Sequence, residues 1–335
     1  MGSRPTAGRM DSNQACQRHK IQDTMKKLLR AIYRRLPIVR DLHVITNELR
    51  DQKQKLTSIE SNIDKFGHFR RLAECANIIQ AIEAIKASDP RYRDLKRLLT
   101  YGAQYWSQNY EDGMIAEIFR RIKPTTMTFV EIGVENGSET NTTALLAQGW
   151  RGWWFEGNPR SCESIRSQLK NMPTLASRLS LLEAFIAPSN IQALFREQDV
   201  PTEVDLFSLD IDLDTYHIWA ALRDFRPRVI VVEYNGAFPS SQNWIHHYKP
   251  ERMWDGSQAF GASLKAYELL GKEYGYSLVA CDLTGINAFF VRDDLVEDNF
   301  AAPFTAENHY EPPRYHLWYR WAHPSCLFGE TQRAK

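Results

Sequence analysis

Blocks of apolar residues, each about as long as one strand or helix, follow one another through the middle of the chain. Residues 127–132 form an apolar run typical of a buried strand, and glycines follow at positions 133 and 137. Residues 138–148 have the spacing of a helix, and a second apolar run, 151–156, ends in an acid. Strand, glycine turn, helix, strand and acid in this order predict a nucleotide-binding βαβ unit.

The residues at the two strand ends indicate which ligand this unit binds. Gly133 lets the backbone turn sharply and come close to a ligand, and the carboxylate of Glu156 is placed to accept both hydroxyls of a ribose. The middle glycine of the dinucleotide fingerprint is absent between Gly133 and Gly137, and no P-loop lysine follows. A ligand with a ribose and no phosphates fits, and S-adenosylmethionine (SAM) is such a ligand. The alternative is an ordinary βα turn of another α/β fold.

Strands and helices continue to alternate after this unit. We expect helices at 113–122, 159–170, 191–196, 214–222 and 257–272, and strands at 179–186, 204–212, 229–234, 276–281 and 288–291. Five β-α repeats closed by a hairpin are the pattern of the SAM-dependent methyltransferase fold. We therefore predict an α/β, Rossmann-like sheet of seven strands with helices on both faces.

Seven short motifs occur in order between residues 104 and 292. They are Ser107-Gln108 with Glu111-Asp112, residues 129–137, Phe155-Glu156-Gly157-Asn158-Pro159, residues 208–212, residues 231–235, Gly261-Ala262-Ser263-Leu264, and Gly275-Tyr276 through residues 287–292. In this order the motifs resemble those of the FkbM family of methyltransferases. The resemblance implies O-methyl transfer, often to sugars or other hydroxylated metabolites. It also implies SAM binding through Glu131, Gly133, Gly137, Glu156, Asn158 and Asp210.

One motif departs from the FkbM pattern. The family sequence Asp-x-Glu-Gly is here Asp210-Ile211-Asp212-Leu213, so the acidic pair is kept and the glycine is lost. This departure indicates a divergent branch of the family and leaves the class of acceptor open.

Three carboxylates are expected at one edge of the predicted sheet. Asp210, Asp212 and Glu233 follow neighbouring strands, and ligands of this fold bind beyond the carboxyl ends of the strands. One carboxylate can act as the base that removes the acceptor proton, and the others can contact SAM or the acceptor. Alternatively, the three together can hold Mg²⁺ through oxygen ligands. A third interpretation is structural, with Asp214 capping the next helix and one of the pair only satisfying backbone groups.

Two histidines are further candidates for the catalytic base. His246 and His247 lie in a long connection, residues 242–255, that also holds Trp244 and Tyr248. Long loops at strand ends often carry substrate contacts, and aromatic rings suit the C–H faces of a sugar. The alternative is a surface loop with incidental aromatic residues.

A heptad pattern precedes the predicted methyltransferase region. Its apolar seam is Leu42, Ile45, Leu49, Leu56, Ile59, Ile63 and Phe66, with Gln52 as one polar interruption. Steps of three and four alternate throughout, which predicts a coiled coil and therefore a homo-oligomer. The alternative is a long helix packed on the catalytic domain. The helix is expected to continue after residue 70 and to break at residues 88–90.

A basic amphipathic segment comes before the heptads. In residues 26–36, Leu28, Leu29, Ile32 and Leu36 share one helical face that Lys26, Arg30, Arg34 and Arg35 flank. Such a helix can lie on an anionic membrane surface, or it can pack on its own domain or on a partner. Residues 1–24 are polar and are expected to be a disordered leader.

Composition narrows the classes further. The 335 residues carry a net charge of only +1, which gives no general attraction to nucleic acid. The five cysteines are scattered without Cys-x-x-Cys pairs, which favours a reducing compartment, and no apolar run is long enough for a membrane span. We expect a cytoplasmic protein, with peripheral contact at the inner face of the membrane as one option.

These patterns predict four regions and two functions. The regions are a leader at 1–24, a basic and coiled-coil region at 25–100, a SAM-dependent methyltransferase domain at 101–300 and an aromatic-rich tail at 301–335. The first function is methyl transfer to a hydroxyl of a sugar, polysaccharide or related metabolite. The second is a non-catalytic oligomeric scaffold whose methyltransferase domain is degenerate. SAM binding discriminates between them.

Overall fold

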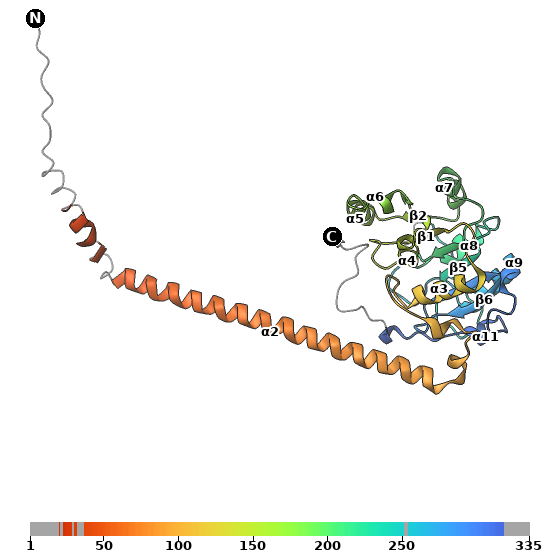
Figure 1. The fold of residues 1–335 in the computed structure, drawn as a ribbon, viewed down its shortest axis with the longest axis horizontal. Coiled ribbons are helices and arrows are strands. Elements are labelled where there is room, and N and C mark those ends of the chain that lie inside the picture. The colour runs from red at the N-terminus through yellow and green to blue at the C-terminus, as the bar shows by residue number, and fades with distance from the viewer. Residues whose placement is uncertain (1–19, 21–22, 29, 32–36, 251–253, 318–335) are drawn as a thin grey trace, which may run out of the picture. The chain divides into compact units, whose positions relative to one another are not determined.

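A computed structural model describes residues 20, 23–28, 30–31, 37–250 and 254–317. The chain divides into two compact units, Met1–Arg71 and Leu72–Lys335. Figure 1 draws the helices and strands of the described residues. Most of the predicted leader, and positions 29 and 32–36 of the basic segment, lie outside the described residues, so the membrane contact stays a prediction.

The predicted heptads lie on one continuous helix, α2 (Pro37–Ser88). It ends where the sequence predicts a break, because Pro90 cannot continue the helix and Asp89 accepts a hydrogen bond from the Arg91 amide at the start of the next turn. Within the first unit, the seam side chains from Ile45 to Phe66 are exposed to solvent.

A single sheet of seven strands organises the second unit. The strands are β1 (Thr128–Ile132), β2 (Arg151–Glu156), β3 (Leu179–Glu183), β4 (Leu206–Leu209), β5 (Val229–Glu233), β6 (Tyr276–Cys281) and β7 (Asn287–Arg292). Their order is β3-β2-β1-β4-β5-β7-β6, and β7 runs in the opposite direction to the other six strands. This order confirms the predicted α/β methyltransferase fold. The order in which strands are added to the sheet reverses between β1 and β4, and in folds of this kind ligands bind at the carboxyl ends of the strands beside such a point.

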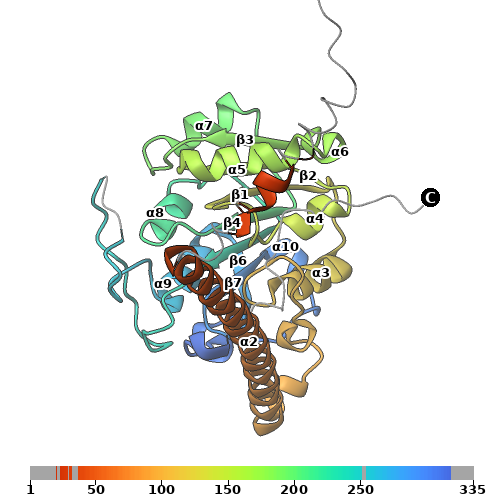
Figure 2. The ribbon, with the colours of Figure 1, turned by 90° about the vertical axis from the view of Figure 1, so that its left-hand side faces the viewer.

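Helices cover both faces of the sheet. They are α3 (Glu111–Ile122), α4 (Thr143–Ala147), α5 (Pro159–Leu169), α6 (Pro173–Ala176), α7 (Ile191–Glu197), α8 (Thr215–Ala220), α9 (Leu264–Tyr274), α10 (Asp293–Val296) and α11 (Ala306–His309). Met114, Leu146 and Ile165 of α3, α4 and α5 pack in one core, whereas Phe195 and Trp219 of α7 and α8 pack in the other. Figure 2 shows α3 and α4 on one side of the strands and α8 and α9 on the other.

Two predicted helices begin later than their sequences indicate. The expected helix at 138–148 starts only at Thr143, because the amides of Asn141 and Thr142 donate to the Glu131 carboxylate instead of joining a helix. The expected helix at 257–272 starts at Leu264, where the side chain of Ser263 caps it. Residues 257–263 form a loop in its place.

The segment between α2 and α3 and part of the tail pack together within the second unit. It contains two 3₁₀ turns, η1 (Pro90–Arg93) and η2 (Leu98–Tyr101), and a third, η3 (Tyr315–Leu317), lies in the tail. Tyr92, Leu99, Leu283 and Leu317 form a small core, and Ile82 of α2 packs against it. The described part of the tail is therefore built into this unit. Among the described residues, no helix is both long enough and apolar enough to cross a bilayer.

Candidate active site

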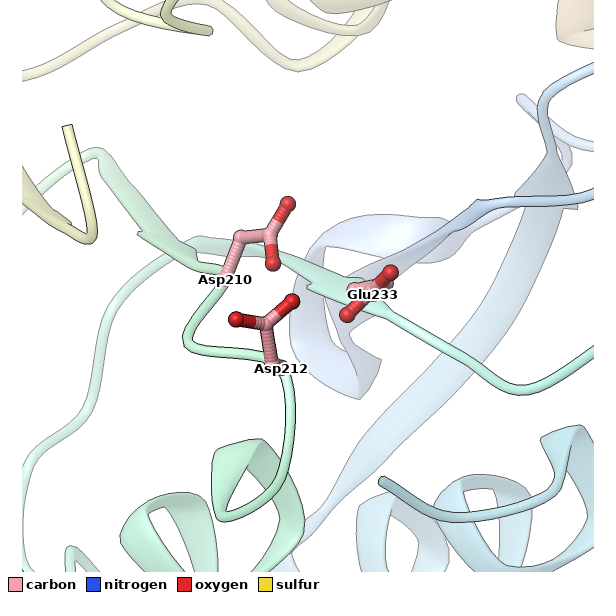
Figure 3. Close-up of side chains that lie close together, drawn as sticks. All are labelled: Asp210, Asp212 and Glu233. Atoms are coloured by element: carbon pink, nitrogen blue, oxygen red, sulfur yellow. The ribbon is translucent and has the colours of Figure 1, made fainter. Parts of the chain in front are cut away.

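Three carboxylates meet at the carboxyl edge of the sheet, as predicted. Asp210 and Asp212 follow β4 directly, and Glu233 is the last residue of β5, the neighbouring strand. One oxygen from each lies within 4.8 Å of an oxygen of the other two. Figure 3 shows the three side chains converging at the ends of the two strands. The sheet register therefore brings together residues that stand more than twenty positions apart.

The three carboxylates differ in how readily they ionise. Burial, followed by the charge of Asp212, raises the pKa of Asp210 to about 6. Burial and the Asp210 charge raise the pKa of Glu233 further, well above its ordinary value. Of the two residues, Glu233 therefore holds its proton to higher pH, and its side chain hydrogen-bonds to that of Asp210. Asp210 is the member of the pair that can accept a proton from a ligand.

The glycine turn after β1 lies directly against this cluster. Gly133 has φ of 82°, and a Cβ built on it would stand 1.7 Å from the carbonyl oxygen of Asp210. Gly137 also has a positive φ, and its amide closes the turn on the Val134 carbonyl at 2.8 Å. Both predicted glycines are thus required by the backbone, and only Gly133 brings the turn into contact with the β4 end.

Glu135 occupies the position where the dinucleotide fingerprint has its middle glycine. Its φ of 48° is the left-handed conformation that glycine adopts easily, and it costs a residue with a Cβ about 1–2 kcal/mol. The Glu135 carboxylate is exposed and raises the pKa of Glu156, Asp210 and Asp212. Sequence reasoning missed this residue, since a glutamate in the loop appeared only as a departure from the fingerprint.

The predicted ribose acceptor, Glu156, ends β2 beside the same turn. Its two carboxylate oxygens accept the amides of Glu135 and Asn158, each at 2.7 Å. Each oxygen keeps a further lone pair for a ligand hydroxyl. Burial raises the Glu156 pKa, and the two amides oppose that shift. Asn158 has a structural role as well, because its side chain caps α5 through the Arg160 amide at 3.0 Å.

Glu131 fixes the loop that leads into α4. Its carboxylate accepts the amides of Asn141 at 2.8 Å and of Thr142 at 3.2 Å, and also the hydroxyls of Thr142 and Ser208. Burial raises the Glu131 pKa to about 7. The amides ahead of α4, which in a dinucleotide-binding protein face a phosphate, are thus already satisfied by a carboxylate. These two amides are therefore not free to bind the pyrophosphate of a dinucleotide.

The histidines belong to a second group. His246 is buried; its backbone carbonyl is 2.8 Å from the Nε2 atom of His217, and its ring interacts electrostatically with Asp214. His247 is exposed. Asp214 precedes α8 without a side-chain capping bond, so the predicted cap is not formed. The structure therefore groups His246 with Asp214 and His217, and groups Asp210 with Asp212 and Glu233.

Two tyrosines near the cluster carried no signal in the sequence. Tyr267 of α9 is fully buried, its hydroxyl has no hydrogen-bond partner among the described residues, and its strongest charged neighbours are Glu233 and Asp210. Tyr315 of η3 is 55% exposed and also senses the charge of Glu233. Because α9 and the tail come close to β5 only in the folded chain, periodicity does not identify either residue.

Comparisons with known proteins give structural neighbours only. No family model matches the sequence, and no curated protein matches it. One structural neighbour is magnesium protoporphyrin IX methyltransferase (ChlM) from Synechocystis PCC 6803 with bound SAM, with a TM-score of 0.37, 9% identity, and coverage of 54% of this chain and 77% of that one.

Two further neighbours are methyltransferases. The glycopeptide N-methyltransferase MtfA complexed with SAM has a TM-score of 0.36 and 10% identity, with 57% of this chain and 96% of that chain covered. The methyltransferase domain of bacterial CtHen1-C has a TM-score of 0.37 and 14% identity, with 55% and 97% covered. At these scores the neighbours add no argument about the site.

Proposed function

We propose that this protein is a SAM-dependent methyltransferase of the FkbM type that acts on a hydroxyl group. The observation that carries the proposal is the chemistry of the sheet edge. Glu135, Glu156, Asp210, Asp212 and Glu233 gather there, and Glu131 fills the place of a phosphate. A nucleoside ligand with a ribose, a positively charged sulfonium and no phosphate matches this edge.

Each group then has a task in methyl transfer. Glu156 accepts the ribose hydroxyls, and Gly133 lets the cofactor lie against the backbone. The acceptor oxygen attacks the methyl carbon in line with the sulfur; the new C–O bond forms as the C–S bond breaks, and its electron pair stays on the sulfur of S-adenosylhomocysteine. Asp210 takes the hydroxyl proton. Positioning of the acceptor supplies much of the rate, because the sulfonium is already a good leaving group.

The aromatic residues of the long connection before α9 support a hydroxylated acceptor with C–H faces. Trp244 stacks on Phe238 with ring centroids 4.3 Å apart, and Tyr248 lies 5.4 Å from the His217 ring. Phe238, Trp244 and Tyr248 belong to the long connection before α9. Tyr315 adds another ring near Glu233. Sugar rings stack well on such side chains. We infer a sugar, polysaccharide or related metabolite as the acceptor.

A bound Mg²⁺ is the alternative way to activate the hydroxyl. The three carboxylate oxygens of Asp210, Asp212 and Glu233 are a donor set that suits this ion. When bound, Mg²⁺ would lower the pKa of an acceptor hydroxyl. A chelator abolishes transfer if the ion is required and has no effect if Asp210 acts alone. We favour the reaction without metal, since the Asp-x-Asp pair replaces the Asp-x-Glu pair of the family, which need not bind a metal.

SAM titration by calorimetry tests the proposal directly. We expect micromolar binding with one site per chain. The competing function, a scaffold with a degenerate domain, predicts no SAM binding by a chain whose thermal unfolding shows that it is folded. Methyl transfer from labelled SAM to a panel of sugars and glycosides, with and without chelator, then identifies the acceptor class.

A further inference from the structure

The first unit carries an apolar stripe on α2 that this unit leaves in solvent. Between Ile45 and Phe66 the seam residues are all at least half exposed: Ile45 at 51%, Leu49 at 61%, Leu56 at 59%, Ile59 at 54%, Ile63 at 64% and Phe66 at 73%. They recur every three and four residues along one side of the helix. A continuous stripe of this length on an exposed helix marks an interaction surface.

The residue types on the stripe indicate which partner covers it. We propose that α2 forms a parallel, in-register coiled coil of more than two copies of this chain. With the heptad written a to g, Leu49, Leu56 and Ile63 occupy a positions, whereas Ile45, Ile59 and Phe66 occupy d positions. Leucine is thus the commonest residue at a and isoleucine at d. Leucine at a with isoleucine at d disfavours two-stranded coils and favours three or four strands.

Gln52 sets the register and the direction of the strands. It takes a d position in the middle of the stripe. In a parallel, in-register assembly the Gln52 side chains of all copies lie in one layer and hydrogen-bond to one another. In an antiparallel pair each amide would face Leu56 and lose its partners, which costs a buried polar group its hydrogen bonds. A single polar layer of this kind excludes other registers.

The charges beside the stripe agree with the parallel arrangement. In such a coil a g residue lies beside the e residue five positions later on the neighbouring chain. Glu48 at g then meets Lys53 at e, and Lys55 at g meets Glu60 at e, so both pairs are opposite in charge. Lys55 also pairs within its own helix with Asp51 at 3.1 Å, which holds it on the flank of the stripe.

Light scattering on the full-length protein tests the assembly. We expect a mass of at least three times the 38.9 kDa of one chain at micromolar concentration. Leu49→Glu should reduce it to one chain, because a charge in the seam lies against the same charge on every copy. Val44→Glu is the matched control, since Val44 is 50% exposed on the same helix but lies off the seam. A monomeric wild type overturns the proposal, because the stripe would then be covered by the second unit or by another protein. A dimer overturns the proposed number of strands.

A charge exchange tests direction and register. Lys53→Glu places like charges opposite Glu48 and should weaken assembly about two- to fivefold per pair. Adding Glu48→Lys to Lys53→Glu should restore it, whereas adding Arg50→Glu, which lies off the seam, should not. Helicity by circular dichroism confirms that each variant still forms α2. If Glu48→Lys gives no rescue, the chains are not parallel and in register.

Discussion

The ionisation of Asp210 and Glu233, at the ends of β4 and β5, should set the pH dependence of methyl transfer. Asp210 ionises with a pKa of about 6, raised by burial, while Glu233 holds its proton to higher pH. A base works only when ionised, so methyl transfer should fall about tenfold per pH unit below about pH 6 and level off above it. A profile of kcat/KM from pH 5 to 8 measures this. A rate that stays level through pH 6 to 5 would remove Asp210 as the base.

The same residue gives a mutational prediction. Asp210→Asn keeps the shape of the side chain and cannot take a proton, so transfer should slow by roughly 10²–10⁴-fold. SAM affinity should change little, because the proposed role of Asp210 is toward the acceptor. Calorimetry and initial rates on the same preparation measure both. Full activity of Asp210→Asn would exclude Asp210 as the base and leave His246, beside Asp214, as the candidate.

Glu156 gives the sharpest test of cofactor binding. Glu156→Ala removes the acceptor of the ribose hydroxyls, and lost hydrogen bonds to a charged group are worth about 1.5–3 kcal/mol, so the Kd for SAM should rise tenfold or more. Glu183→Ala is the control, since Glu183 ends β3 as the register partner of Glu156 and forms an exposed ion pair with Arg166. Equal SAM affinity in the two variants would contradict the ribose role.

A site residue could be predicted when it lies at the end of a strand, and could not when a contact between distant segments brings it to the site. Asp210, Glu156 and Gly133 stand at strand ends, and strand ends can be located from apolar runs. The left-handed backbone of Glu135 and the approach of Tyr267 to Glu233 depend on contacts between distant segments. Such contacts leave no periodic trace, so the sequence contains no local signal for these two residues.

At the scale of elements, the glycine turn connects cofactor binding to the β4 end. Gly133→Ala should destabilise the protein and abolish SAM binding, because its Cβ would meet the Asp210 carbonyl at 1.7 Å. Gly256→Ala is a matched control, since Gly256 has φ of 80° but no atom within 4 Å of a built Cβ. Thermal unfolding with and without SAM compares them. If both variants lose the same stability, the loss comes from backbone strain and not from the contact with β4.

Strands were predicted more accurately than helix starts. Buried parallel strands are continuous apolar runs, and β1, β2 and β5 begin and end within a residue or so of the predicted limits. The predicted limits of β3 and β4 were less accurate, since both strands end three residues before them. The start of α4 was wrong because helix spacing extends back to residue 138, while Glu131, from another element, takes the amides that the first turn would need. A tertiary hydrogen bond overrode a local pattern.

At the scale of the whole molecule, the structure places a boundary inside α2. Contacts separate Met1–Arg71 from the rest, whereas the sequence places the boundary near residue 100, where composition changes. Residues 78–99 pack within the second unit: Tyr92 and Leu99 share a core with Leu283. Composition did not reveal this, because the apolar residues on the end of α2 have the same spacing whether they face another copy or their own domain.

This boundary gives the last prediction. Deleting residues 1–71 should leave the melting temperature and SAM affinity of the remaining chain unchanged, and should abolish self-association. Deleting residues 1–100 also removes Arg91 and Tyr92, which bind the buried Glu311 at 2.6 and 2.8 Å, and it uncovers Leu283 and Leu317. A buried carboxylate then loses two of its partners, so the melting temperature should fall by about 5–10 °C. Calorimetric scans of the two truncated proteins decide between a boundary at 71 and one at 100, because equal melting temperatures would show that residues 72–100 contribute nothing to the stability of the second unit.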